Sequence, residues 1–466
     1  MPTDTTPPDL PLADIQGFVL RGYRSFIYGR HFVTVVASPP AARGFLGALA
    51  TQTPGGLRVT TAAKWQVKPD YTLNVGFTCE GLEALGVSAA VLSDFPPEFQ
   101  SGAVGQAGII FDVGASGPAN WVGGMGTPGN VHAIFSLFAT TSESLELHSA
   151  ILRNGFAGCF REVFSHDGKA LPENRVHFGF RDGISQPSLV NGPAPSHRYP
   201  DELGIHGHSP WGDFILGYPN TFNNGPVYSP ALAATSLGAN GSFGAFRILK
   251  QDVAAFFDYL RKAAASVNFT PEQIAARLLG RWSNGVPLAL SPDSDSPIPE
   301  HRLNMFLYKG IADGQASPDP FGTACPIGAH IRRGNPRDEI VQGGFTQQAR
   351  IIRRNLPYGK EFDAAHPDDG IERGLVGYFI NADFANQFQF LMSTWMNSSA
   401  FAGGQITGAD PLIGDNDSNA SQFFIPTSNK THLALSGFSR FVITRGSAYC
   451  FLPGIRGVSC LATQSC

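Results

Sequence analysis

The pattern of apolar and polar positions predicts alternating strands and helices in the first part of the chain. The stretch YTLNVGFT places Leu73, Val75 and Phe77 at every second position, which is the period of a half-buried strand. Apolar residues three or four positions apart predict helices, and Ser142 or Ser144 could cap one of them. The strands are expected at 31–37, 71–78 and 131–139, and the helices at 41–50, 81–87 and 141–154.

The second part of the chain repeats this alternation. GAFRILK at 244–250 predicts a strand, QDVAAFFDYLRKAAA directly after it predicts a helix, and SRFVITRG with SAYCFLPG at 439–454 predicts a pair of strands. This order indicates two α+β halves. We expect the first domain at 1–160 and the second at 161–466, with a loop-rich insertion at 190–243.

The composition argues against two classes of partner. The 466-residue chain is 42% apolar, which is enough for a full core, and only 15% of its residues are charged. With a formal net charge of −4, the chain has no strong basic balance that would argue for nucleic acid, and it would be little attracted to an anionic membrane surface. The 54 glycines and 35 prolines follow no period, which suggests long ordered loops between the elements.

The targeting signals in the sequence do not decide between a cytoplasmic and a secreted location. The N-terminus, MPTDTTPPDLPLADIQG, has acids and prolines where a signal peptide has a basic start and an apolar run, and no stretch predicts a transmembrane span. A cytoplasmic location is expected if Met1 is the native start, and secretion if this is a mature form without its leader. Secretion would give a role to six N-x-S/T sequons, at Asn240, Asn268, Asn397, Asn416, Asn419 and Asn429.

The six cysteines form neither a CxxC pair nor a zinc-like spacing. They are expected to be mostly buried thiols. A disulfide near the C-terminus, among Cys450, Cys460 and Cys466, stays open as an alternative.

The first candidate for chemistry is GFRDGISQP, residues 179–187. Glycines allow a tight turn or a close approach of the backbone to a flat ligand, so Gly179 and Gly183 would hold Arg181 and Asp182 in a fixed direction. A carboxylate that the backbone fixes in this way is expected to have a function.

His330, in CPIGAHIRRGNPRD, is the second candidate. The small residues before it would let a large flat group approach the imidazole. Arg332, Arg333 and Arg337 follow it and suit an anionic cofactor that bears carboxylates. A basic loop that makes surface ion pairs is the alternative interpretation.

A second basic segment, ARIIRRNLPYG, contains the neighbours Arg353 and Arg354. Adjacent residues of a strand point to opposite faces, so the two side chains cannot both point inward. One is expected to be functional or buried, and the other solvated.

Six motifs, in this order, resemble the dye-decolourising peroxidase family. They are DIQG at 14–17, GFTCEGLEALGV at 76–87, GFRDGISQP at 179–187, CPIGAHIRRGNPRD at 325–338, IIRRNLPYG at 351–359 and GADPLIG at 408–414. GFRDG looks like the family's GxxDG signature, which is weak alone and strong together with the histidine and arginine segments. The resemblance spans nearly the whole chain, and the chain length is similar to that of the larger fungal and bacterial members.

The resemblance implies one haem b per chain, held in the C-terminal of two ferredoxin-like domains whose antiparallel sheets are flanked by helices. His330 matches the proximal iron ligand, Asp182 the distal acid–base residue and Arg353 the distal arginine. We chose Arg353 over its neighbour because the family's arginine stands five positions before the aromatic of a Pro-Tyr-Gly step, here Tyr358. Asp410 is the best match for the acid that accepts a hydrogen bond from the proximal imidazole.

The implied activity is that of a haem peroxidase. It would use hydrogen peroxide to oxidise bulky aromatic donors, such as anthraquinone and other dyes, phenols, lignin-derived compounds or carotenoids, in one-electron steps through a ferryl intermediate. Asp182 would move a proton between the peroxide oxygens, Arg353 would stabilise charge on the departing oxygen, and Asp410 would make the imidazole richer in electrons. Asn355 could add a distal hydrogen bond, or it could be a turn residue before Leu-Pro. The chain would be a monomer or a weak homo-oligomer.

Two further features of the resemblance concern the rim and walls of the haem site. Tyr358 and Trp395 fall where some family members carry surface residues that pass electrons, although an aromatic side chain usually packs. Leu375 is expected to contact the haem. It belongs to Gly-Leu-Val-Gly, where the family commonly has Gly-Leu-Leu-Phe, so Gly377 removes an aromatic wall. Tyr378 could fill the space, or the pocket could be wider.

Two hypotheses from other classes compete with the peroxidase. A haem-binding or haem-processing protein of the same fold, without efficient peroxidase turnover, would need no distal acid. A haem-free enzyme such as a hydrolase would use Asp182 with another carboxylate. The presence of both Asp182 and Arg353 favours the peroxidase.

Overall fold

The computed structural model of the chain describes residues 10–51, 56–190, 208–221, 227–312, 314–339, 341, 349–367, 369–402, 408–417, 421–427 and 431–465. The sequons at Asn419 and Asn429 and part of the insertion predicted at 190–243 lie outside these residues.

The first half of the chain forms four antiparallel strands with helices between them. The strands are β1 (Tyr28–Val36), β2 (Tyr71–Phe77), β3 (Ala133–Ala139) and β4 (Phe160–Lys169), and the main helices are α2 (Pro39–Ala50), α3 (Cys79–Ala84), α5 (Pro97–Gln106) and α6 (Ser142–Phe156). The three strands and three helices predicted here are confirmed. The helix cap differs, because the Thr141 side chain, and neither serine, accepts the hydrogen bond from the backbone N–H of Ser144.

The second half adds four more strands. These are β7 (Ser242–Gln251), β8 (Ile352–Tyr358), β9 (Gly374–Asn381) and β12 (Val442–Leu452), and the main helices are α8 (Val253–Ser266), α9 (Pro271–Leu279), α10 (His330–Gly334), α11 (Ile455–Thr463) and the π-helices η7 (Phe384–Gln389) and η8 (Leu391–Met396). The strand at 244–250 and the helix after it are confirmed.

The predicted pair of strands at 439–454 is wrong, because the segment is the single strand β12. Its pairing with β7 runs from Val442 to Leu452, and the register shifts between Thr444 and Gly446. A bulge therefore accommodates the Arg-Gly-Ser step that resembles a turn in the sequence.

Both halves belong to one sheet. β12 pairs with β2 through Phe451 and Phe77, which gives the order β4-β1-β3-β2-β12-β7-β9-β8. Each half follows a β-α-β-β-α-β order with its strands arranged 4-1-3-2, so the fold is α+β with two ferredoxin-like halves, as predicted. The exact domain boundary stays a prediction.

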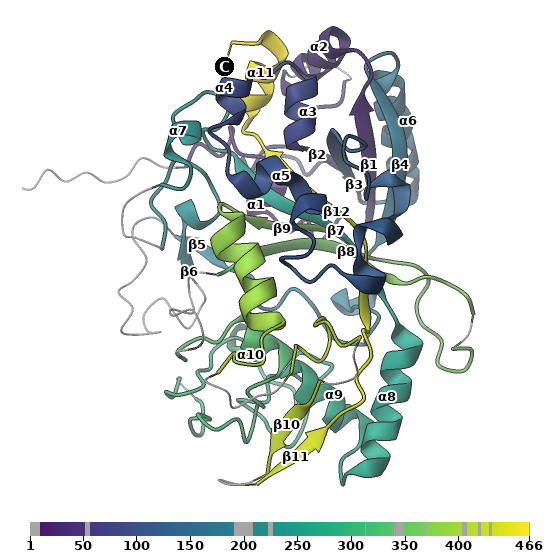
Figure 1. The fold of residues 1–466 in the computed structure, drawn as a ribbon, viewed down its shortest axis with the longest axis vertical. Coiled ribbons are helices and arrows are strands. Elements are labelled where there is room, and N and C mark those ends of the chain that lie inside the picture. The colour runs from purple at the N-terminus through teal and green to yellow at the C-terminus, as the bar shows by residue number, and fades with distance from the viewer. Residues whose placement is uncertain are drawn as a thin grey trace, which may run out of the picture.

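The two halves of the sheet pack against each other. The rings of His31 on β1 and Phe246 on β7 have centroids 5.1 Å apart, and a Cβ added at Gly29 on β1 would lie 2.8 Å from Leu356 on β8. One buried apolar core runs through both halves. Figure 1 shows α2, α3, α6 and α11 at one end of the molecule and α8, α9 and α10 at the other, with β7, β8, β9 and β12 between them.

Short elements complete the described structure. They are α1 (Gly17–Leu20), α4 (Ala89–Leu92), α7 (Pro230–Ala233), β5 (Ser188–Val190), β6 (His208–Pro210), β10 (Phe423–Pro426), β11 (His432–Leu435) and the 3₁₀ turns η1 (Gly114–Ser116), η2 (Pro118–Asn120), η3 (Val122–Gly124), η4 (Pro172–Asn174), η5 (Trp211–Asp213) and η6 (Glu300–Arg302).

Cysteine pairing and hydropathy complete the description. Cys460 is disulfide-bonded, Cys450 is a free buried thiol, and Cys466 lies outside the described residues. Among the residues that the structure describes, no helix combines the length and the apolar character that crossing a membrane requires.

Candidate active site

A cavity of about 280 Å³ lies against the strands of the second half. Its apolar wall includes Leu249 of β7, Phe379 of β9 and Phe388 of η7. Its polar groups come from segments far apart in the sequence and include Asp182, His330, Arg350 and Arg353. The cavity therefore brings together the three motifs that the sequence singles out.

The GFRDG loop holds Asp182 at the cavity in a fixed orientation. Gly179 and Gly183 have φ angles of 85° and 78°, which side chains with a Cβ rarely adopt. The backbone N–H of Asp182 donates to the carbonyl of Asn174 at 2.8 Å, and that of Arg181 donates to Ser283 at 3.0 Å. The loop is thus held by backbone hydrogen bonds at Arg181 and Asp182, as its glycines predict.

Asp182 pairs with Arg353 rather than with a second carboxylate. Arg353 Nη2 donates to Asp182 Oδ1 at 3.0 Å, and the two side chains are 32% and 40% exposed. Gln186, four residues after Asp182, donates to the Arg353 carbonyl at 3.2 Å and accepts from its N–H at 3.1 Å. The loop and β8 are therefore joined by an ion pair and by two hydrogen bonds from the Gln186 side chain to the Arg353 backbone, and Asp182 Oδ2 keeps no protein partner among the described residues.

Arg353 and Arg354 point to opposite faces of β8, as strand geometry predicts. Arg353 lines the cavity. Arg354 turns away from it and donates to the carbonyls of Phe18 at 2.5 Å and Val19 at 3.2 Å, which end α1. The arginine chosen from the sequence is thus the one that reaches Asp182.

His330, the first residue of α10, is the imidazole among the cavity-lining residues. Its Nδ1 lies 3.0 Å from Asp410 Oδ2, while Asp410 Oδ1 accepts from the N–H groups of Leu412 and Ile413, both at 2.9 Å. With Nδ1 as the donor, Nε2 carries a lone pair and has no protein partner among the described residues.

The charge of Asp410 is stabilised by its neighbours. Complete burial alone would raise the pKa of this carboxyl, but His330, Arg333 and the Ile413 N–H together hold it below its usual value. An ionised Asp410 both orients the ring of His330 and makes its free nitrogen a better electron donor.

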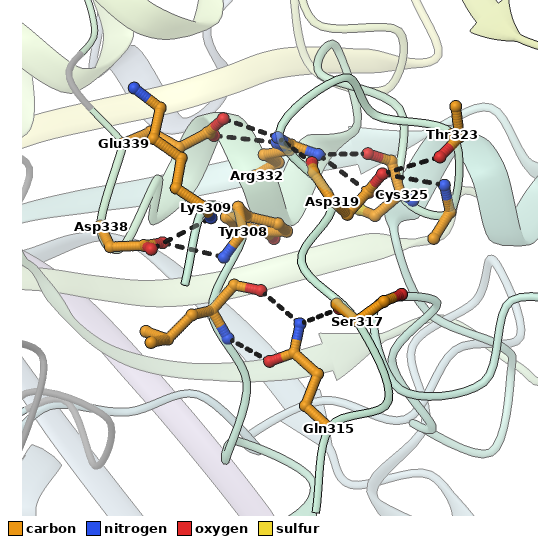
Figure 2. A network of polar contacts seen from close by, with 12 residues as sticks. Tyr308, Lys309, Gln315, Ser317, Asp319, Thr323, Cys325, Arg332, Asp338 and Glu339 are labelled. Carbon is orange, nitrogen blue, oxygen red and sulfur yellow. Dashed lines mark hydrogen bonds and ion pairs between the residues drawn. The ribbon is translucent and has the colours of Figure 1, made fainter. Parts of the chain in front are cut away.

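Arg332 does not reach the cavity, in contrast to the prediction that it meets a cofactor carboxylate. Figure 2 shows its guanidinium between two acids. It donates to Glu339 at 2.6 and 2.8 Å and to Asp319 at 3.1 Å, and it stacks over Tyr308 at 4.1 Å from the ring centroid. The side chain is fully buried, and these two acids neutralise its charge inside the protein.

Arg333 also points away from the cavity. Its guanidinium donates to the carbonyls of Trp395, Ser398 at 3.1 Å and Gly408 at 2.6 Å. These bonds tie α10 to η8 and to the segment that carries Asp410. In place of the predicted cofactor contact, Arg333 supports the pair formed by His330 and Asp410.

The two aromatic residues predicted at the surface are buried. Trp395 is 1% exposed and packs on Phe390 and Phe401. Tyr358 is 7% exposed, and its hydroxyl donates to Glu372 at 3.1 Å. Packing against neighbours, the usual fate of an aromatic side chain, removes both from direct contact with a large donor.

Leu375, which is expected to contact the haem, lies on the cavity wall, and Gly377 follows it on the same face of β9. A Cβ at Gly377 would lie 2.1 Å from the carbonyl oxygen of Arg354, so the close strand pairing excludes any side chain there. Tyr378 does not fill the space, because it faces the core and packs on Phe18. Phe379, two positions after Gly377, supplies an aromatic wall instead.

Three functional candidates escaped the sequence analysis or were left open by it. Gln186 lies within the quoted motif, where its spacing from Asp182 was the available signal. Asn355 is a strand residue, not a turn residue; it lines the cavity, and its buried side-chain oxygen has no partner among the residues that the structure describes. Arg350 is 7% exposed and lines the cavity, but nothing in the basic segment distinguishes it from its neighbours.

These residues fit a haem. The walls of the cavity are largely apolar. His330 lines it with one ring nitrogen free of a protein partner among the described residues, and the Asp182 carboxylate and the Arg353 guanidinium line it as a pair. Elsewhere in the described part of the chain, no group of three His, Cys, Asp or Glu side chains is arranged to hold a metal ion. A single imidazole suits a metal that brings its own ring of ligands. Fold and site together define the class of haem peroxidases with paired ferredoxin-like halves.

Comparison with known proteins identifies the family. The chain is 31% identical to dye-decolourising peroxidase msp1 of Mycetinis scorodonius over 96% of its own length and 87% of that protein. The crystal structure of the peroxidase from Auricularia auricula-judae superimposes with a TM-score of 0.79 at 26% identity, covering 98% and 100% of the two chains. A dye-decolourising peroxidase in complex with 2,6-dimethoxyphenol gives a TM-score of 0.78 at 26% identity, covering 97% and 100%. No family model matches the chain.

The chain therefore belongs to the dye-decolourising peroxidase family and is an oxidoreductase of the haem peroxidase class.

Proposed function

We propose that the chain binds one haem b in this cavity, where His330 Nε2 would hold the iron. The observation that carries the proposal is the convergence of His330, paired with Asp410 at 3.0 Å, and Asp182, paired with Arg353 at 3.0 Å, on one apolar-walled cavity. Haem, when bound, supplies the redox-active iron of the reaction.

Asp182 is the acid–base residue of this site. Its Oδ2, free of protein partners, takes a proton from hydrogen peroxide and returns it to the oxygen that leaves as water. The bond from Arg353 to Oδ1 keeps the carboxylate aimed at the cavity. A protein that only stored haem would not need a positioned proton acceptor.

Arg353 stabilises negative charge on the departing oxygen, since a guanidinium stays protonated throughout the working pH range. Gln186 fixes the backbone of Arg353, so the cation keeps its place when peroxide enters. Asn355 offers a further hydrogen-bond acceptor on the same strand.

The reducing substrates are proposed to be aromatic donors such as phenols and dyes. Support comes from the family itself and from the related peroxidase seen with 2,6-dimethoxyphenol. We propose that the chain acts as a monomer or weak homo-oligomer, because the whole candidate site is built from a single chain.

The test is stopped-flow absorbance of the haem-loaded protein mixed with hydrogen peroxide. Asp182→Asn should bind haem with a normal Soret band and react with peroxide about 10²- to 10⁴-fold more slowly. Asp415→Asn is the matched control, because Asp415 lines the same cavity and also pairs with an arginine, Arg440. It should react at close to the wild-type rate.

His330→Ala provides the second arm, in which the haem should be lost or bound loosely. Equal peroxide reactivity of Asp182→Asn and the wild-type protein would overturn the acid–base role. A wild-type protein that binds haem but does not react with peroxide would favour the alternative function of haem binding or processing.

A further inference from the structure

Six arginines line the cavity, and most are already neutralised by the protein. Arg247 pairs with Asp112, Arg353 with Asp182, Arg440 with Asp415, and Arg181 with Glu300 outside the cavity. Arg281 has no acid, but it donates to the carbonyls of Gly285 and Leu303 and to the side-chain oxygen of Asn304.

Arg350 is the exception. It is 7% exposed, and its guanidinium has no hydrogen bond or ion pair among the residues that the structure describes. Burial lowers the pKa of this group to about 10, helped by the nearby charges of Arg337 and Arg353 and opposed by that of Asp213. It therefore stays a cation at neutral pH although it has lost most of its hydration, which is unfavourable unless an anion joins it.

The one nearby acid is occupied elsewhere. Both oxygens of Asp213 accept from Thr221, at 2.8 Å from its N–H and 2.7 Å from its hydroxyl. Burial raises the pKa of Asp213 to about 7, so this carboxyl is partly protonated near neutral pH. It is a poor counter-ion for Arg350.

The backbone of Arg350 is nevertheless held firmly. The side-chain amide of Gln387 on η7 donates to the carbonyls of both Arg350 and Asp213, each at 2.8 Å. The guanidinium is thus a cation held in place at a cavity wall and without a partner, which is the arrangement of a receptor for a carboxylate.

We propose that Arg350 binds a carboxylate of the haem, the role that the sequence suggested for Arg332 and Arg333. This inference rests on the proposed haem site. Because the acids of the cavity are paired and Arg350 is not, the carboxylate of the cofactor completes the charge balance when it binds.

The test compares haem with haem dimethyl ester, whose two carboxylates are blocked, by spectroscopic titration of the haem-free protein. The wild-type protein should bind haem roughly ten- to a hundredfold more tightly than the ester, as expected for a buried charge-assisted hydrogen bond. Arg350→Leu should abolish this preference, and Arg350→Lys should retain part of it. Since the readout is a ratio within each variant, general losses of stability cancel.

Arg354→Leu is the matched control, because Arg354 is a neighbouring arginine that donates to backbone carbonyls away from the cavity. It should keep the wild-type ratio. The haem-free proteins give an independent readout: Arg350→Leu should raise Tm, because it removes a buried charge without a partner.

The outcomes separate this inference from the proposed function. If the wild-type protein binds haem but does not distinguish it from the ester, or if Arg350→Leu keeps the preference, the role of Arg350 is overturned while the haem site stands. If the wild-type protein shows no Soret band with haem, both fail. A preference that is lost in Arg350→Leu and kept in Arg354→Leu supports the inference.

Discussion

Two arginine pairs look alike in the sequence and differ in the folded protein. Arg332 and Arg333 follow His330 in α10, and neither reaches the cavity. Arg353 and Arg354 lie on β8, and one of them reaches it. Side chains of a strand alternate between its two faces, so one arginine of β8 points to the cavity and the other points away from it. On the short helix α10, the side chains of Arg332 and Arg333 both point into the protein interior.

The difference also shows how the protein handles buried positive charge. Arg332 pairs with two acids, and the two terminal nitrogens of Arg333 donate to three backbone carbonyls, so neither guanidinium depends on a ligand for its main contacts. Arg353 is partly exposed and paired to Asp182 by a single bond. Arg332 and Arg333 are thus held inside the protein by the chain itself, while Arg353 keeps capacity for a ligand. Four substitutions test this contrast.

The largest effect is expected for Arg332→Met. It leaves Asp319 and Glu339 buried without their cation, so the free energy of unfolding should fall by about 3–5 kcal/mol in chemical denaturation. The peroxide rate per folded molecule should stay within a few-fold of wild type. Arg153→Met, which breaks an exposed pair with Glu162, should cost about 1 kcal/mol or less. Similar losses in both variants would contradict the structural role of Arg332.

Arg353→Leu should show the opposite pattern. The rate of reaction with peroxide should fall about 10²- to 10³-fold in stopped-flow measurements, because charge on the departing oxygen loses its stabilising cation. Its pair with Asp182 is one-third exposed, so the free energy of unfolding should change by only about 1 kcal/mol. A variant that reacts within threefold of wild type would show that Arg353 has no part in the chemistry.

Arg354→Met should reduce stability by a smaller amount, about 1–3 kcal/mol, because the buried carbonyls of Phe18 and Val19 lose their donor. Urea denaturation measures the loss. The peroxide rate per folded molecule should be unchanged, in contrast to Arg353→Leu. A hundredfold slower reaction would mean that the two faces of β8 are not separate in function.

Gln186→Leu should have the smallest effect. Losing two hydrogen bonds to the backbone of Arg353 leaves the cation less well placed, and the peroxide rate should fall by about tenfold or less. Gln100→Leu is the control, since Gln100 donates to the carbonyl of Phe95, far from the cavity motifs in the sequence. Equal rates for the two variants would remove Gln186 from the site.

Much of the site was readable from its motifs. His330, Asp182, Arg353 and Leu375 all line one cavity, and Asp410 stands behind His330 as expected. Glycine spacing and strand alternation are local rules, so they applied without knowledge of the rest of the fold. Predictions that depended on distant neighbours were less successful, namely those for the arginines of α10 and for the exposure of Tyr358 and Trp395.

The sequence by itself determined the alternation of strands and helices in each half, the turn that fixes Asp182 and the residue types of the chemistry, because these follow from backbone preferences and side-chain pKa values over short stretches. Only the tertiary structure decided which cations are neutralised. Arg332 pairs with Glu339 seven residues away, whereas Arg350 pairs with no acid in the part of the chain that the structure describes, and both belong to basic segments. The sum of charges around a buried group depends on what folding brings within a few ångströms of it, and no local pattern records that.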